Sequence, residues 1–464
     1  MTLTHILILA ALSIPFMRLV PAQFRPWGLL IGSVLGITWF ISDGTLTGLD
    51  FMLVMATLIL TVTVWWVIQP ESGQDRQALF LLGGLVVLLG IGTWLFGDHV
   101  SLSFLLGFSG LTIVMMISAA ALLDREQFKG AALGLVILII VILIVIKVPG
   151  LARFFGMSFD WDAEALSSAS PFVWLGFSYM GFRLIGLLQD YRAGRLPKGG
   201  FSLRDMAVYT LFFPAFTAGP IDQARRFVPE MNQAKPLDAS RLIEGSTRIA
   251  VGIFKKFIIA DSLALVAMNP TLIDQTSSTG GLWVLLYLYA FQIFFDFSGY
   301  SDVAIGLGRL YGITLPENFD RPYTQANIQQ FWQRWHITLS TWFRVYFFTP
   351  FSRMLIRSPY KIPQWAIILV CQMATMILIG LWHGVTVNFL LWGAWHGVGL
   401  FAHKMLADNT KKWHKWTMQR AWTRYIMVGG SVFATFHFVA LGWVFFALPE
   451  TSQSLDMLRR LFGG

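Results

Sequence analysis

FQIFFDFSGYSDVAIGLG (Phe291–Gly308) sets two aspartates inside an apolar run long enough to belong to a membrane-spanning helix. FWQRWHITLS (Phe331–Ser340) then places a histidine among tryptophans and an arginine. LWHG (Leu381–Gly384) ends a long apolar segment on a second histidine. Ionisable residues are costly at membrane depth, so each one in these three stretches is a candidate functional residue.

The composition is that of a multi-pass membrane protein. The chain has 464 residues, of which 56% are hydrophobic and 13% charged, whereas soluble chains carry about 25% charged residues. The mean hydropathy is +0.63. We therefore expect an all-α fold of roughly eleven to thirteen transmembrane or re-entrant helices, each about 20 residues long. The apolar segments fall near residues 3–20, 27–42, 50–68, 78–96, 101–123, 130–148, 171–189, 205–222, 247–268, 282–312, 364–381, 386–403 and 425–447.

The chain is expected to be a single membrane domain over 1–464, because no polar stretch is long enough for a soluble domain. Residues 1–150 are almost purely apolar and predict a helical scaffold, whereas 171–403 carry nearly all the polar residues of the apolar segments and predict the catalytic core. Residues 404–464 form a basic loop and a last helix. No internal repeat is visible, which disfavours a transporter built from two related halves.

The charge pattern predicts how the chain lies in the membrane. The net charge of +9 indicates contact with anionic lipid and a positive-inside bias, and it does not indicate nucleic-acid binding. The basic stretches Tyr191–Arg204, Ser352–Lys361 and Lys404–Arg424 should face the cytoplasm. The last two flank an apolar hairpin, so His383 would lie away from the cytoplasmic surface of the inner (plasma) membrane.

The stretch WQRWHITLSTWF (Trp332–Phe343) has a helical periodicity. On one helix Trp332, Trp335 and His336 share a face with Leu339 and Phe343. This pattern predicts an amphipathic helix that is spanning, re-entrant or interfacial. A bystander histidine in an aromatic belt is the alternative to a functional one.

The aspartates of DFSGYSD are expected to turn inward. Asp296 and Tyr300 are spaced i, i+4, as are Ser298 and Asp302, and neither acid can cheaply face lipid. We expect them to hydrogen-bond inside the protein or to pair with basic residues. A polar network that fixes helix packing is favoured over direct chemistry.

Two histidines follow in the next apolar hairpin. His383 sits at a helix end before a glycine, where desolvation favours the neutral imidazole, a competent general base. The alternative is a core histidine bonded to a backbone carbonyl. His396 lies on the next helix in GAWHG. No tight cluster of metal ligands occurs in the sequence, so no metal is expected.

Taken in order, the motifs resemble the membrane-bound O-acyltransferases. FQIFFDFSGYSDVAIGLG, LPENFDRPY (Leu315–Tyr323), FWQRWHITLSTW, LWHG and LWGAWHG (Leu391–Gly397) carry the resemblance. It is to the bacterial branch that includes alginate O-acetyltransferase and the D-alanyl-lipoteichoic-acid transferase, and it covers roughly 171–403.

The resemblance implies that the helices surround a central tunnel. It also implies transfer of an acyl group from a cytoplasmic thioester, expected to be acetyl-CoA, to a hydroxyl of an exported polysaccharide or cell-wall glycan. His383 would be the catalytic base and His336 the second catalytic residue. No bound cofactor is expected. We expect a separate partner outside the cytoplasm, either an acyltransferase or a polysaccharide-assembly protein. The candidates for donor binding or orientation are Trp332, Arg334, Trp335, Trp382, Asp296, Ser298, Tyr300, Asp302, Asn318 and His396.

Other functions remain open from the residues. D-alanyl transfer from a carrier protein to teichoic acid needs the same chemistry. A proton-coupled transporter would use the aspartates and histidines as a relay. A non-catalytic scaffold of the same fold is the third alternative.

Overall fold

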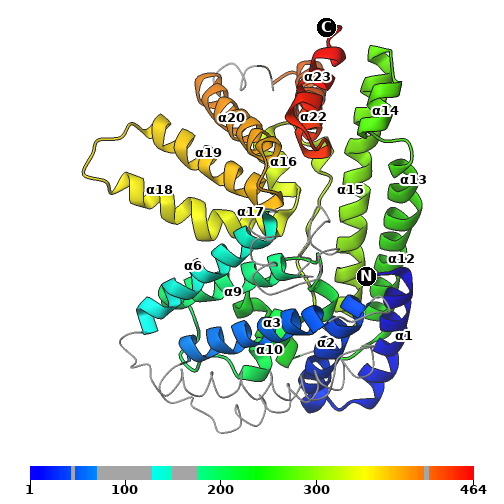
Figure 1. Cartoon of the computed structure of the whole chain (residues 1–464), viewed down its shortest axis with the longest axis vertical. Coiled ribbons are helices and arrows are strands. Elements are labelled where there is room, and N and C mark those ends of the chain that lie inside the picture. The colour runs from blue at the N-terminus through cyan, green and yellow to red at the C-terminus, as the bar shows by residue number, and fades with distance from the viewer. Residues whose placement is uncertain (43–47, 70–127, 149–175, 234, 412–416, 418) are drawn as a thin grey trace. The chain divides into compact units, whose positions relative to one another are not determined.

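The computed structural model describes residues 1–42, 48–69, 128–148, 176–233, 235–411, 417 and 419–464. Every regular element in these ranges is helical, which confirms the all-α prediction (Figure 1). By length and composition, four of the described helices can cross a membrane, at Gly130–Lys147, Thr279–Leu310, Gln364–His383 and Ala421–Ala447. The predicted segments 78–96 and 101–123 lie outside the described residues, so the expected number of helices stays a prediction.

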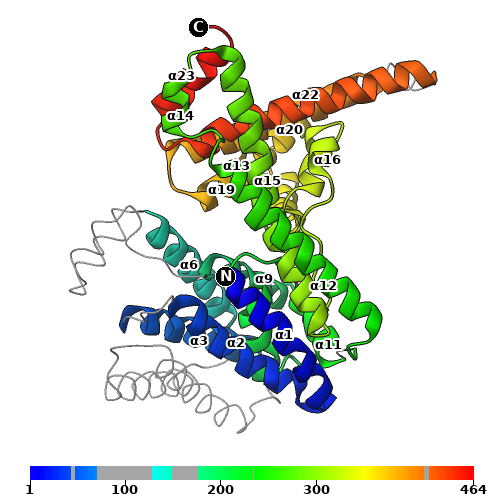
Figure 2. The same ribbon diagram turned by 90° about the vertical axis from the view of Figure 1, so that its right-hand side faces the viewer.

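The chain divides into two compact units. The first comprises Met1–Ala250 and Asp302–Pro316, and the second comprises Val251–Ser301 and Glu317–Gly464. The helix α15 (Thr279–Leu310) contributes residues to both units, with 279–301 in the second and 302–310 in the first (Figure 2). The boundaries that we expect from composition, near residues 150 and 403, stay a prediction.

In the first unit, α10 packs against α2, α3 and α9. Phe213 ends this segment by donating its backbone N–H to Ser33. We expected one apolar segment over 205–222, but α10 stops at Leu211, because Pro214 has no N–H with which to continue the helix. The helices of this unit are α1 (Leu3–Leu19), α2 (Arg25–Ser42), α3 (Gly48–Ile68), α6 (Phe128–Lys147), α9 (Phe177–Arg192), α10 (Leu203–Leu211), α11 (Ala224–Asn232) and most of α12 (Ala239–Ile253).

In the second unit, α19 (Gln364–His383) and α20 (Val387–Asn409) form the expected hairpin (Figure 1). Gly380 and Gly393 allow the two backbones to touch, since a Cβ at Gly393 would lie 2.5 Å from the Met376 carbonyl oxygen. The other helices are α13 (Asp261–Ala264), α14 (Pro270–Gln275), α16 (Ile328–Arg334), α17 (Ile337–Phe343), α18 (Thr349–Ile356), α22 (Ala421–Ala447) and α23 (Thr451–Leu461), with π-helical turns at Phe254–Ala260 and Arg344–Phe348.

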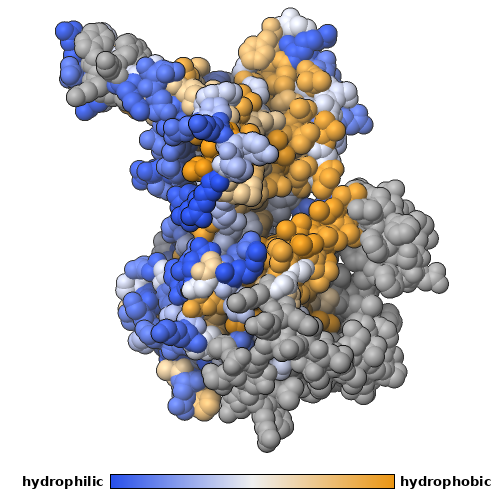
Figure 3. Space-filling model, turned by 90° about the vertical axis from the view of Figure 1, so that its left-hand side faces the viewer, coloured by the Kyte–Doolittle hydropathy of each residue, from blue (hydrophilic) through white to orange (hydrophobic). Residues whose placement is uncertain are grey.

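Large apolar side chains remain exposed on the spanning helices. In α6 only 17% of the membrane-length window is buried, and Ile137 is 53% exposed. Figure 3 shows broad apolar patches on one face of the protein. Such surfaces are typical of helices that contact lipid.

Candidate active site

His336 lies at a break between two short helices. Helix α16 ends at Arg334 and α17 begins at Ile337, while His336 adopts φ 42° and ψ 56°, the left-handed conformation. The single helix that we expected through this stretch is therefore wrong. The shared face is nevertheless real, because Trp332, Trp335 and His336 are all buried. Neither helix is long enough to cross a membrane, since seven residues rise only about 10 Å.

Asn318 fixes the break at His336. Its main-chain carbonyl accepts the N–H of Ile337 at 2.9 Å. Its side-chain oxygen accepts the Thr338 hydroxyl at 2.7 Å and the Thr338 N–H at 3.3 Å. The Asn318 amide in turn donates to the Ser301 hydroxyl at 3.3 Å. Non-glycine residues rarely adopt the left-handed conformation unless the surroundings enforce it, and strained residues of this kind cluster at functional sites.

The His336 side chain is held in an apolar environment. It is 2% exposed, and its ring meets Phe297 of α15 in a T-shaped contact with centroids 4.6 Å apart. Burial lowers the pKa of His336 from 6.5 to about 3, because the imidazolium would lose its hydration. His336 is therefore neutral at physiological pH and can act as a hydrogen-bond donor or acceptor.

His383 occupies the last position of α19, as we predicted from LWHG. Gly384 follows in an extended conformation and turns the chain towards α20, whose N-terminus is capped by the Thr386 side chain. The imidazole packs against Phe446 of α22, with ring centroids 4.9 Å apart. Unlike His336, His383 is only partly buried.

A continuous series of ring contacts joins the three candidate histidines. Trp382 contacts His383 at 4.6 Å and His336 at 6.2 Å between ring centroids. Trp392 of α20 contacts His383 at 5.5 Å and His396 at 4.9 Å. The second unit thus brings together residues that the sequence separates by up to 60 positions, within one aromatic cluster.

The two aspartates pair with basic residues, as expected, but in different places. Asp302 belongs to the first unit and is bonded by Arg248 at 2.6 Å, with its own side chain 6% exposed. Asp296 belongs to the second unit, where Lys256 reaches it at 2.7 Å. The Asp296 side chain is 49% exposed, so the expectation that both acids turn inward is wrong for this one.

The remaining predicted residues are Arg334, Ser298 and Tyr300. Arg334 is partly exposed and pairs with Asp320. Ser298 is buried and Tyr300 is partly buried on α15. No group of three or more potential metal ligands occurs among the described residues.

Three aromatic residues that the sequence did not single out belong to the cluster. Phe297 contacts His336. In the sequence it stands between Asp296 and Ser298, which were both singled out. Trp392 lies between His383 and His396. Trp443 of α22 stacks on Trp392 with centroids 5.9 Å apart. The spacing of Trp392 and His396, four residues apart in LWGAWHG, is the signal that could have found Trp392.

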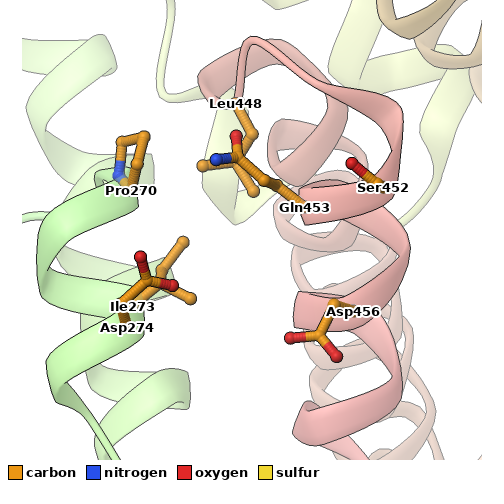
Figure 4. Close-up of a pocket in the computed structure, with 7 residues that line it drawn as sticks. All are labelled: Pro270, Ile273, Asp274, Leu448, Ser452, Gln453 and Asp456. Carbon is orange, nitrogen blue, oxygen red and sulfur yellow. The ribbon is translucent and has the colours of Figure 1, made fainter.

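A separate pocket of about 240 Å³ opens between α14 and α23. Figure 4 shows Asp274 and Asp456 on its opposite walls, with Gln453 and Leu448 above them. None of the candidate histidines lines this pocket. It offers no general base other than carboxylates, so the aromatic cluster is the better candidate for acyl transfer.

Comparison with known proteins identifies the family. Residues 105–448 match the family model of MBOAT, the membrane-bound O-acyltransferases. The chain belongs to the membrane-bound O-acyltransferase family. All three candidate histidines of this membrane-bound O-acyltransferase lie within the matched range, as do Asn318 and Trp392.

Bacterial O-acetyltransferases and a D-alanyltransferase are among the proteins to which this membrane-bound O-acyltransferase is similar. The chain is 31% identical to the probable alginate O-acetylase AlgI of Pseudomonas syringae pv. tomato, over 84% of this chain and 70% of that protein. It is 34% identical to the teichoic acid D-alanyltransferase of Bacillus subtilis, over 59% of this chain and 68% of that protein. It is also 34% identical to the peptidoglycan O-acetyltransferase of Helicobacter pylori, over 58% and 49% respectively.

Proposed function

We propose that this multi-pass membrane protein transfers an acetyl group from cytoplasmic acetyl-CoA to a hydroxyl of an exported polysaccharide or cell-wall glycan. The observation that carries the proposal is the aromatic cluster, in which Trp382 contacts both His383 and His336. Similarity to the probable alginate O-acetylase over most of both chains supports acetyl transfer to a polysaccharide.

His383 is the general base in this proposal. It is the partly exposed histidine of the cluster, so an acceptor hydroxyl can approach its ring. A general base must come within hydrogen-bond reach of the proton that it removes. The thioester is already activated, so no acyl-enzyme on serine or cysteine is required. The buried and neutral His336 orients the reactants on the other side of Trp382.

A separate extracytoplasmic protein is proposed to carry the acetyl group onward or to present the glycan. The described residues contain no soluble catalytic unit. Transfer through a tunnel would keep the thioester away from water until the acceptor arrives.

The test uses purified protein in lipid nanodiscs, labelled acetyl-CoA and a panel of candidate glycans. We expect His383→Ala to lower acetyl transfer by about 100-fold or more, the scale of general-base catalysis, while acetyl-CoA still binds. His403→Ala, which removes a histidine of α20 outside the cluster, is the matched control and should retain activity. Full transfer by His383→Ala would refute the mechanism.

D-alanyl transfer from a carrier protein to teichoic acid is the second candidate. It is favoured by the 34% identity to the Bacillus subtilis D-alanyltransferase. Supplying D-alanyl carrier protein in place of acetyl-CoA distinguishes the two donors. A proton-coupled transporter would instead move solute in vesicles without turnover of either thioester, and a non-catalytic scaffold would do neither.

A further inference from the structure

Three aromatic side chains form a closed triangle beside His383. The ring centroids of Trp332 and Trp392 are 5.7 Å apart, and those of Trp332 and His396 are 5.1 Å apart. The third side, from Trp392 to His396, measures 4.9 Å. The three side chains come from α16 and α20. Trp332 is 7% exposed, Trp392 is 1% exposed and His396 is 0% exposed.

The nitrogen atoms of this triangle have no hydrogen-bond partner in the part of the chain that the structure describes. They are Nε1 of Trp332, Nε1 of Trp392 and both ring nitrogens of His396, and all are sealed from solvent. A buried polar group without a partner destabilises the folded protein, because it has lost its hydrogen bonds to water. Native proteins retain such groups rarely, and a catalytic role is one of the few reasons for keeping them.

Neighbouring tryptophans behave differently. Trp395, three residues after Trp392 on α20, donates its Nε1–H to the Phe438 carbonyl oxygen at 2.9 Å. Trp443, which stacks on Trp392, donates to the Tyr323 hydroxyl at 3.1 Å. The same unit therefore satisfies indole groups where an oxygen is available, and the triangle lacks that oxygen.

The hydrogen-bonding groups of the triangle determine which kind of chemical group it can bind. An indole nitrogen only donates, and a neutral imidazole has one donor and one acceptor nitrogen. The triangle thus holds three N–H donors against one acceptor. A carbonyl oxygen or an oxyanion would find several donors here, whereas a cation would meet one acceptor nitrogen and ring faces that already pack against one another.

We propose that Trp392 and Trp332 bind the carbonyl oxygen of the acyl thioester and stabilise the oxyanion that forms on it. This inference rests on the proposed function. Trp392 contacts the ring of His383 at 5.5 Å, so the carbonyl group would lie beside the base. His396 completes the site with a third N–H. Because the nitrogen atoms of the donors are sealed from solvent, the rings must part on the side of His383 to admit the acyl group.

The step is a balanced acyl transfer. His383 takes the proton of the acceptor hydroxyl while the hydroxyl oxygen forms a bond to the thioester carbonyl carbon. The carbonyl electron pair moves to the oxygen, which the indole N–H groups hold as an oxyanion. The intermediate collapses, the carbon–sulfur bond breaks, and the leaving thiolate takes the proton from His383.

The variants Trp392→Phe and Trp332→Phe remove one N–H each and keep an aromatic ring. Trp395→Phe is the matched control, because it removes an indole N–H that already has a partner on the same helix. Turnover is measured in nanodiscs with the thioester that the wild-type protein uses, acetyl-CoA or a D-alanyl carrier protein. We expect kcat of Trp392→Phe to fall about 100-fold, with the control near wild type.

A binding measurement separates this role from packing. With a CoA donor, one analogue is a ketone in which CH₂ replaces the thioester sulfur, and the other is S-ethyl-CoA, which lacks the carbonyl. The wild-type protein should bind the ketone more tightly, and this preference should be smaller in Trp392→Phe, which keeps the donors of Trp332 and His396. With a carrier-protein donor, the same two groups are attached to the carrier.

The outcomes distinguish the two proposals. Wild-type turnover with unchanged kcat in Trp392→Phe, or a loss of thermal stability alone, would mean that the triangle holds trapped water or only packs, and would overturn this inference. Absence of wild-type turnover with both thioesters would overturn the proposed function together with it.

Discussion

Asn318 holds His336 in a left-handed turn by accepting hydrogen bonds from the two residues that follow His336. The carbonyl of Asn318 accepts the N–H of Ile337, and its side-chain oxygen accepts both donors of Thr338. Because Asn318 is fully buried, no water can replace these bonds. The orientation of one candidate catalytic residue therefore depends on a side chain 18 positions earlier in the chain.

Replacement of Asn318 by alanine should lower both stability and activity. The change removes the acceptor for Thr338 and leaves its N–H buried, which costs about 2–3 kcal/mol of unfolding free energy. Thr338→Val keeps the N–H bond and removes only the hydroxyl donor, so it should cost about 1 kcal/mol. Unfolding in detergent and acyl transfer in nanodiscs measure the two effects. Equal stability of the two variants would show that Asn318 does not fix the turn.

The left-handed conformation of His336 can be tested with a pair of substitutions. The left-handed conformation costs alanine roughly 1–2 kcal/mol, whereas asparagine adopts it more readily. We expect His336→Asn to be more stable than His336→Ala by about 1 kcal/mol, although both lose acyl transfer. Retention of activity in His336→Asn would limit His336 to shaping the backbone.

The pH dependence of stability should report the burial of His336. The pKa is about 3 in the folded protein and about 6.5 in the unfolded chain. The unfolded state thus takes up a proton first, and the free energy of unfolding falls as the pH drops below about 6.5. At pH 5 the loss attributable to this residue is about 2 kcal/mol.

Comparison of the wild-type protein with His336→Asn isolates this contribution, since other titrating groups affect both. The wild-type melting temperature should fall more steeply than that of the variant between pH 7 and pH 5. Parallel curves would show that His336 is hydrated or protonated in the folded protein.

The sequence predicts the helical class and the hairpin of α19 and α20 because apolar periodicity and length are local properties. It also places His383 at a helix end, since His383 follows a long apolar segment and is itself followed by a glycine. The break at His336 could not be predicted in the same way. The local pattern fits a continuous helix, and it is Asn318, distant in the chain, that stabilises the turn.

The partners of the aspartates show a second limit of sequence reasoning. Cost at membrane depth predicts that Asp296 and Asp302 find basic partners, and both do. It does not predict that they fall in different compact units. Trp392 was missed for a related reason. Its four-residue spacing to His396 places both on one helix face, but the sequence does not show that its nitrogen lacks a partner beside His383.

The hairpin that carries His383 should be sensitive to the size of one residue on α20. A Cβ at Gly393 would lie 2.5 Å from the Met376 carbonyl oxygen and 2.8 Å from the Ile377 Cα. Both are backbone atoms, so α19 and α20 must separate to admit a methyl group. We expect Gly393→Ala to cost about 1–3 kcal/mol and to lower kcat of acyl transfer, because separation moves His383 away from Trp392.

Gly430 on α22 supplies the matched control. Nothing lies within 4 Å of a Cβ at this position, and alanine is the better helix former by about 1 kcal/mol. Gly430→Ala should therefore be neutral or slightly stabilising and should leave acyl transfer unchanged. If Gly393→Ala matched this control in both melting temperature and kcat, close packing of the hairpin would not be what positions His383.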